Sequence, residues 1–224
     1  QDESDERMAF LPLCHIAERV GGEYHALYTG AVLNFVENPE TVPENVREIA
    51  PTVFTAVPRV WEKFYSGVLI RLKEAGALQQ SAYKVAIGIG YWQAKLREER
   101  KPVPAGLAFA FWLARLLVLD NVRKAIGVHR SKILITAAAP ISPDLVRWYM
   151  ALGLEMLEAW GQTESCGAVT GNPRGGAKPG SIGPMMPYSE VKVSPEGELL
   201  VRGPGVFMGY LHQPEKTAET VTDG

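Results

Sequence analysis

One short segment of the chain combines the residue types that could hold a nucleotide and its metal ion. It reads Trp160-Gly161-Gln162-Thr163-Glu164 and follows a predicted strand at 154–159. The indole offers a flat surface, the glycine lets a ligand approach the backbone, the hydroxyl donates, and the carboxylate binds a cation. Open α/β sheets bind ligands at the carboxyl ends of their strands, where this segment would lie. The alternative is a strand-to-helix turn in which Thr163 caps a short helix and Glu164 is solvated.

The elements that would position this segment begin with alternating strand and helix patterns. Short apolar runs at 8–13, 31–35 and 53–57 have the length of strands, and helical patterns at 16–28 and 43–50 lie between them. This order predicts α/β architecture, with a parallel sheet and helices packed on it.

A helical excursion is predicted over residues 59–127. Its helices fall at 59–74, 81–100 and 106–126, separated by Ala75-Gly76 and by Pro102 and Pro104. The third contains a strongly apolar run at 105–114, which Arg115 and Asp120 interrupt before the roughly 20 apolar residues that a bilayer requires. We therefore expect a buried helix that is too short to span a membrane. The alternative is a membrane-surface or acyl-chain-facing role.

The α/β pattern resumes after the helices and then gives way to a second unit. Strands are predicted at 131–136 and 154–159, with a helix at 143–152 that Ser142 caps. A Gly- and Pro-rich loop is expected after Gly167 as far as Pro187. Strands at 190–193 and 198–202, joined by 194–197, then predict a hairpin. The expected division is an α/β unit at 1–187 and the start of a small β-barrel-like unit at 188–224.

Composition narrows the classes of function. The 224 residues are 46% hydrophobic and 21% charged with a net charge of -2, which is typical of a globular domain and excludes a nucleic-acid footprint. Cys14 and Cys166 form no CxxC pair, which favours a reducing compartment and hence the cytoplasm. Because the chain starts at Gln1 and stops on the turn pair Asp223-Gly224, we expect an internal piece of a longer protein. Composition predicts no oligomeric state.

Six segments resemble, in order, motifs of the adenylate-forming superfamily, which includes acyl-CoA synthetases, firefly luciferases and peptide-synthetase adenylation domains. The chain looks most like the long-chain fatty acyl-CoA ligases. At 137–142 it has Ala-Ala-Ala-Pro where that family usually has Gly-Gly-Ala-Pro, and at 160 it has Trp where Tyr is usual. The similar segments are 11–19, 51–63, 137–142, 157–164, 178–183 and 197–210.

The resemblance implies a ligase that uses a fatty acid, ATP and CoA. The carboxylate would attack the α-phosphate of ATP to form an acyl-adenylate and pyrophosphate, and the CoA thiol would then displace AMP. No protein nucleophile is needed, so catalysis would depend on positioning and on charge stabilisation by donors and Mg²⁺.

The resemblance also implies roles for individual residues. Trp160 would stack on adenine, Thr163 would hydrogen-bond the α-phosphate, and Glu164 would hold Mg²⁺. His15 would lie beside the acyl carboxylate and the α-phosphate. The alternative for His15 is a histidine buried in the core, and the alternative for Trp160 is a packing role. The expected catalytic residues are Thr163, Glu164 and His15. The expected nucleotide-site residues are Ala138, Ala139, Pro140, Ala159, Trp160, Gly161, Gln162 and Thr163.

Other parts of such a site are expected elsewhere. The family's phosphate loop would lie upstream, its ribose-binding Asp just beyond Asp223, and its catalytic Lys in a mobile C-terminal domain. We therefore predict that the 224 residues alone bind nucleotide weakly and do not turn over. The alternative function is a non-catalytic nucleotide-binding or helical scaffold, in which helices 81–126 serve as a partner or membrane surface.

Overall fold

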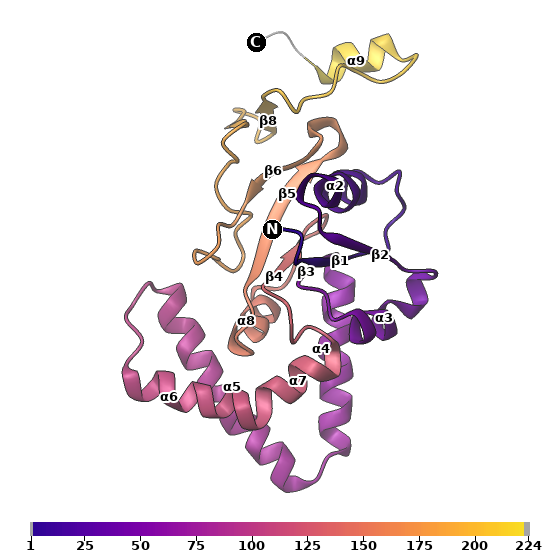
Figure 1. Cartoon of the computed structure of the whole chain (residues 1–224). Helices are drawn as coiled ribbons and strands as arrows, with labels where there is room; N and C mark the ends of the chain where they lie inside the picture. The colour runs from indigo at the N-terminus through magenta and orange to yellow at the C-terminus, as the bar shows by residue number, and fades with distance from the viewer. Residues whose placement is uncertain (1, 222–224) are drawn as a thin grey trace.

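Eight strands lie in three small sheets in the computed structural model, which describes residues 2–221. The predicted Asp223-Gly224 turn lies outside the described residues. Figure 1 shows the long strand β5 in the middle of the molecule, with helices below it and the C-terminal strands above it. The parallel pairs are β1 (Glu6–Ala9) with β2 (Val32–Phe35), β3 (Val53–Ala56) with β4 (Ile133–Thr136), and β4 with β5 (Met156–Gln162); β6 (Gly167–Gly171) is antiparallel to β5. The predicted α/β fold with a parallel sheet is confirmed.

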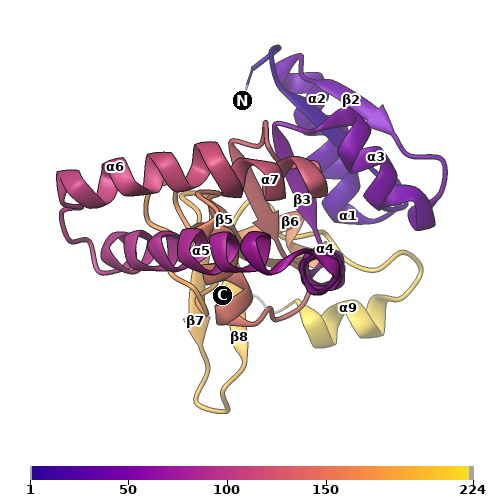
Figure 2. The same ribbon diagram turned by 90° about the horizontal axis from the view of Figure 1, so that it is seen from below.

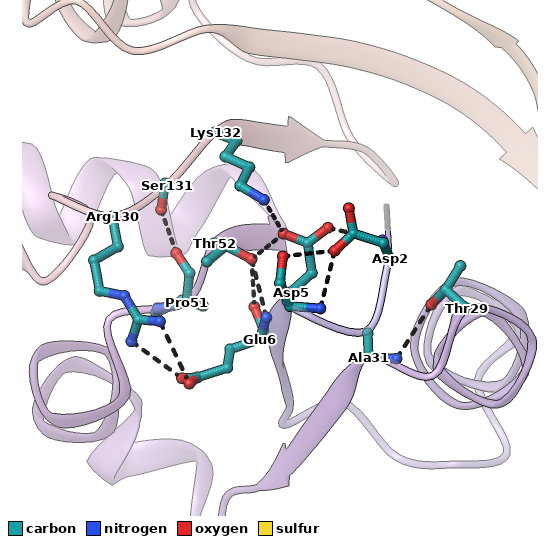
Figure 3. A network of polar contacts seen from close by, with 11 residues as sticks. Asp2, Asp5, Glu6, Thr29, Ala31, Pro51, Thr52, Arg130, Ser131 and Lys132 are labelled. Carbon is teal, nitrogen blue, oxygen red and sulfur yellow. Dashed lines mark hydrogen bonds and ion pairs between the residues drawn. The ribbon is translucent and has the colours of Figure 1, made fainter.

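A polar network joins the first sheet to the second. Thr52 N donates to Glu6 O at 2.9 Å, and the Thr52 hydroxyl donates to Asp5 Oδ1 at 2.7 Å. Lys132 Nζ donates to the same Asp5 oxygen at 2.8 Å (Figure 3). Burial alone would raise the pKa of Asp5, but the hydrogen bonds from Lys132 and Thr52 outweigh it and hold that pKa at about 2. An ionised carboxylate therefore ties β1 to the segments that enter β3 and β4.

The first strand ends earlier than its predicted range of 8–13. After Ala9, the backbone N–H groups of Phe10 and Leu11 donate to the Glu18 carboxylate at 3.2 and 3.1 Å. These donors therefore leave the strand ladder, and the apolar run continues as a turn. Gly22 makes room for this arrangement, because a Cβ there would lie 2.0 Å from Glu18 Oε1.

Short helices connect β1 to β2 and β2 to β3. The first connection contains a π-helical turn, so the predicted helix at 16–28 is continuous but changes its winding. The helices are α1 (Ile16–Glu18), η1 (Arg19–Tyr24) and α2 (His25–Thr29), followed by η2 (Pro39–Thr41) and α3 (Val42–Ile49).

The predicted helical excursion forms a layer beneath the central sheet, with α5 and α6 side by side in Figure 2. It consists of α4 (Pro58–Glu74), α5 (Ala77–Glu98), α6 (Ala105–Ala114), η3 (Arg115–Leu119) and α7 (Asp120–Ile126). The last three form one 22-residue helix that is long and apolar enough to cross a membrane by length and composition, with only 22% of its most apolar window buried. The expectations of a buried helix and of one too short to span were therefore wrong. Arg115 does not interrupt it, because Asp120 accepts its hydrogen bond at 3.1 Å.

Buried aromatic side chains fix the helices to the sheet. Trp61 packs edge-on against Phe54 and Tyr149, and all three are fully buried. Their polar atoms are satisfied, since Trp61 Nε1 donates to Ala56 O at 3.1 Å and Tyr149 Oη donates to Trp61 O at 2.9 Å. The helix α8 (Pro143–Ala151) packs on α5 at Gly90, where a Cβ would lie 2.1 Å from Ala151 O. This contact explains why a glycine stands in the interior of α5.

Residues beyond β5 differ partly from their prediction. The expected loop after Gly167 begins instead with strand β6, which forms because β5 offers it an antiparallel partner. The predicted hairpin is present as β7 (Glu190–Val193) and β8 (Leu199–Arg202), and a short helix α9 (Pro214–Thr220) follows. These last elements lie above the carboxyl end of β5 in Figure 1.

Candidate nucleotide site

Two segments meet at the carboxyl edge of the central sheet. Thr136, the last residue of β4, is in register with Glu158 on the parallel strand β5. Residues 137–140 therefore leave the sheet beside the stretch of β5 that leads to 160–164. The structure brings together the Ala138–Pro140 and Trp160–Glu164 segments, which lie more than 15 residues apart in sequence.

The end of β5 is irregular at the predicted site. The pairing with β6 shifts between Trp160 and Gly161, forming a bulge. A Cβ at Gly161 would lie 1.8 Å from Gly167 O, so the glycine is required by the close approach of β6. Trp160 and Ala159 are half-buried and Gln162 is exposed. The structure thus gives Gly161 a structural role in addition to the ligand approach that we predicted.

Thr163 is exposed at the start of the 3₁₀ turn η4 (Thr163–Ser165). The turn is closed by Ser165, whose hydroxyl accepts from Gln162 N at 3.1 Å and lies 3.0 Å from Gly167 O. Thr163 therefore does not act as the helix cap that the alternative interpretation required. Within residues 2–221 its hydroxyl has no hydrogen-bond partner, so it is available to a ligand.

Glu164 is tied to the C-terminal segment. Tyr210 Oη donates to Glu164 Oε1 at 2.6 Å, and Phe207 N donates to Glu164 O at 2.8 Å. The hydrogen bond from Tyr210 lowers the pKa of Glu164, with a smaller contribution from Lys216, and raises the pKa of Tyr210. Sequence reasoning missed this pair; the signal was the family-like segment that ends in Gly209-Tyr210.

The carboxylate at Glu164 fits one expected feature of a magnesium site. The hydrogen bond from Tyr210 favours its charged form, and no other side chain among the described residues donates a hydrogen bond to it. Mg²⁺ commonly binds one or two carboxylates together with substrate phosphates and water. No group of three or more His, Cys, Asp or Glu side chains that could hold a metal ion occurs in residues 2–221. Glu164 would therefore share the ion with phosphate oxygens.

The backbone after β4 has an unusual conformation. Ala138 has φ of 71°, in the left-handed region that favours glycine, and this is the position where the resembling family has glycine. Ala138, Ala139 and Pro140 are all exposed. Immediately before them, Thr136 Oγ1 is buried without a partner in the described part of the chain. The edge thus presents backbone surface and one unsatisfied hydroxyl.

His15 lies on the surface. Its side chain is exposed, and Nδ1 accepts from Ala17 N at 3.1 Å as the N-cap of α1. The core-histidine alternative is therefore wrong. No hydrogen bond among the described residues joins His15 to Thr163 or Glu164.

A loop that sequence reasoning did not assign to the site is anchored on β5. The buried Glu158 carboxylate accepts from Gly180 N at 2.7 Å, and burial raises its pKa. Asn172 Nδ2 donates to Glu158 O at 3.2 Å and Asn172 Oδ1 accepts from Lys178 N at 3.1 Å. The family-like segment 178–183 is thereby fixed to the strand that carries Trp160.

A separate cleft of about 600 Å³ lies between the C-terminal turn of α5 and residues 175–178. Tyr91, Arg97 and Arg147 are among its lining residues, and none of 160–164 is. The sheet edge formed by residues 137–140 and 160–164, called the nucleotide edge, is therefore a different surface from this cleft.

These features define a class of protein with a parallel α/β sheet. At the ends of two neighbouring strands, such a sheet carries a turn of small residues and an aromatic-Gly-Gln-Thr-Glu segment. A family profile described as "AMP-binding enzyme" matches residues 1–211. The chain belongs to this family of adenylate-forming enzymes.

Two curated relatives in this family are named as fatty-acid–CoA ligases. The chain is 32% identical over 223 residues to a putative fatty-acid–CoA ligase, fadD11, of Mycobacterium tuberculosis, covering 98% of this chain and 39% of that protein. It is 32% identical over 227 residues to the long-chain-fatty-acid–CoA ligase ACSBG2 of Gallus gallus, covering 96% of this chain and 29% of that protein. The chain thus spans less than half the length of these relatives.

Solved structures show the same fold. ATP-bound MatB from Rhodopseudomonas palustris matches with a TM-score of 0.63 and 22% identity, over 99% of this chain and 36% of that one. The anthranilate CoA ligase AuaEII in complex with anthranoyl-AMP matches with a TM-score of 0.62 and 19% identity, over 97% and 35%. At these identities the likeness establishes the fold alone.

Proposed function

We propose that the whole protein is an AMP-forming ligase that activates a long-chain fatty acid as an acyl-adenylate and transfers it to CoA. Support for this substrate class comes from the names of the two curated relatives. The observation that carries the proposal is the parallel register of Thr136 with Glu158, because the chain continues from these two residues into Ala138–Pro140 and Trp160–Glu164.

Each residue at this edge contributes a different kind of contact. The half-buried Trp160 would provide a face for adenine, and the exposed backbone after Ala138 would border it. The free hydroxyl of Thr163 would donate to a phosphate oxygen as the fatty-acid carboxylate attacks phosphorus. Glu164 would hold Mg²⁺, which, when bound, supplies positive charge against the phosphate oxygens. These residues therefore bind and orient the substrates, without a protein nucleophile.

Substituting Glu164→Gln or Thr163→Ala in the full-length protein tests the proposal. Each change should lower acyl-adenylate formation by about a hundredfold, the typical effect of removing one charge-stabilising contact. ATP–pyrophosphate exchange with palmitate and with acetate measures both the loss and the preference for chain length. The matched control is Glu215→Gln, an exposed carboxylate on α9 outside the proposed site, which should leave the rate unchanged.

Two outcomes would count against the proposal. Unchanged adenylate formation in both site variants, with nucleotide binding retained, would favour the non-catalytic scaffold. Exchange with acetate as fast as with palmitate would keep the ligase class but reject the long-chain substrate.

A further inference from the structure

The 22-residue helix formed by α6, η3 and α7 turns an apolar face to solvent. Its window of highest hydropathy averages 1.5, although only 22% of that window is buried. One side packs into the core through Leu107, Phe111, Ala114, Leu119 and Ile126. The exposed fractions on the outward side are 62% for Phe109, 56% for Trp112, 58% for Leu116 and 66% for Leu117. Phe109 and Trp112 stack with ring centroids 5.9 Å apart. Phe109, Trp112, Leu116 and Leu117 together form the α6 apolar face.

A π-helical turn keeps the two sides of this helix separate along its length. The segment η3 has the wider i to i+5 winding, and Leu119 at its end is fully buried. The extra residue in this turn returns Leu119 and Ile126 to the side of Leu107. Leu116 lies two regular turns after Phe109 and therefore on the same side, and the neighbouring Leu117 is exposed as well.

Charged residues are few along the first two thirds of the helix. Arg115 is the one charged residue between Pro102 and Leu119 in the sequence. Asp120 accepts hydrogen bonds from its Nε and Nη2, both at 3.1 Å, and also from Arg123 Nη1 at 3.1 Å, so one carboxylate is shared by two arginines within the helix. Lys101 before the helix and Lys124 near its end are both exposed. Among residues 2–221, the ammonium of Lys101 pairs with the exposed Glu99 alone, at 2.7 Å, and such pairs are weak.

We propose that the α6 apolar face docks flat on the surface of an anionic membrane. Interfacial helices place Trp, Phe and Leu among the acyl chains and Lys or Arg at the headgroups. The helix cannot span the bilayer in this fold, because its other side is part of the protein core. A second copy is the less suitable occupant, since both ends of the face carry lysines that would repel in either orientation. The same lysines attract anionic headgroups.

Vesicle co-sedimentation of the chain tests this proposal, which does not depend on the ligase activity. Vesicles of phosphatidylcholine alone and of phosphatidylcholine with one third phosphatidylglycerol are compared at 0.1 M salt. The paired substitution Phe109→Glu with Trp112→Glu should weaken partitioning to the anionic vesicles at least tenfold. Leu27→Glu is the matched control, because Leu27 is 77% exposed on α2, and it should partition like the unaltered chain. Circular dichroism and urea unfolding verify that each variant folds.

Removing the lysine charges gives an independent readout. Lys101→Gln with Lys124→Gln should reduce the preference for anionic over neutral vesicles while the protein remains folded. The proposal is overturned if the paired glutamate variant partitions as well as the unaltered chain, or if Leu27→Glu weakens partitioning equally. It is also overturned if sedimentation velocity shows that the glutamate pair only dissociates a dimer and leaves vesicle binding unchanged.

Discussion

Two small residues at the nucleotide edge have opposite relations to their backbone. Gly161 is required by sterics, because β6 occupies the space that a Cβ would take. Ala138 has a Cβ in spite of its φ of 71°. A left-handed conformation costs an L-residue about 1–2 kcal/mol, so the turn after β4 stores strain beside the site.

Replacing Ala138 with glycine should therefore stabilise the chain. Relief of the strain exceeds the roughly 0.4–1 kcal/mol of added entropy in the unfolded chain, so we expect a net gain of up to about 1 kcal/mol. The matched control is Ala139→Gly, which has no positive φ to relieve and should lose stability. Urea unfolding of both variants measures the difference. Equal losses in the two variants would show that Ala138 is unstrained.

At the scale of elements, one buried carboxylate joins the first sheet to the second. Asp5 is only 2% exposed and accepts from Thr52 and Lys132, which stand at the starts of β3 and β4. Its pKa of about 2 lies below the ordinary value of 3.8. A lowered pKa means that the folded state favours the ionised form. The stabilisation is therefore complete above about pH 4 and is lost as the pH falls towards 2.

Asp5→Asn should consequently lower the free energy of unfolding by about 1–2 kcal/mol at pH 7. The difference from the unaltered chain should shrink as urea titrations are repeated down to pH 2.5. Asp144→Asn, whose side chain is 93% exposed, serves as the control and should change stability little at any pH. A loss that is independent of pH would show that packing, and not the charge, carries the effect.

Sequence reasoning predicted elements best where the signal was local. The parallel strands, the helical layer and the hairpin at 190–202 follow from apolar runs and turn residues. Strand β6 was missed because Gly167 and Gly171 weaken its pattern, and it is held by pairing with β5 and by a bridge between Thr170 and Met185. The exposed side of α6 could not be predicted either, since an apolar sequence does not tell which side the fold will cover.

The same contrast applies to the candidate site. Trp160, Thr163 and Glu164 could be predicted as site residues because they lie within one five-residue segment that follows a strand. Tyr210 was not assigned to the site, because a partner 46 residues away leaves no local pattern. Glu158 was likewise missed, since it looks like any strand residue until Gly180 reaches it.

At the scale of the whole molecule, the predicted nucleotide site in residues 2–221 is an open edge of the sheet. The side chains predicted to serve it are the Glu164 carboxylate and the Thr163 hydroxyl, and the relatives are more than twice as long. We therefore predict that residues 1–224 alone show no ATP–pyrophosphate exchange with palmitate and bind ATP weakly, with a Kd above about 1 mM. The full-length protein assayed in parallel is the control. Robust exchange by the isolated chain would contradict this prediction.

The hydrogen bond from Tyr210 to Glu164 joins the predicted nucleotide site to the C-terminal segment. A cation that bound the Glu164 carboxylate more tightly without this hydrogen bond, or with it, would be coupled to the position of Tyr210. By reciprocity, a change that fixed or released the segment around Tyr210 would then alter the affinity of Glu164 for that cation by the same factor. The C-terminal elements would in that case regulate the predicted site.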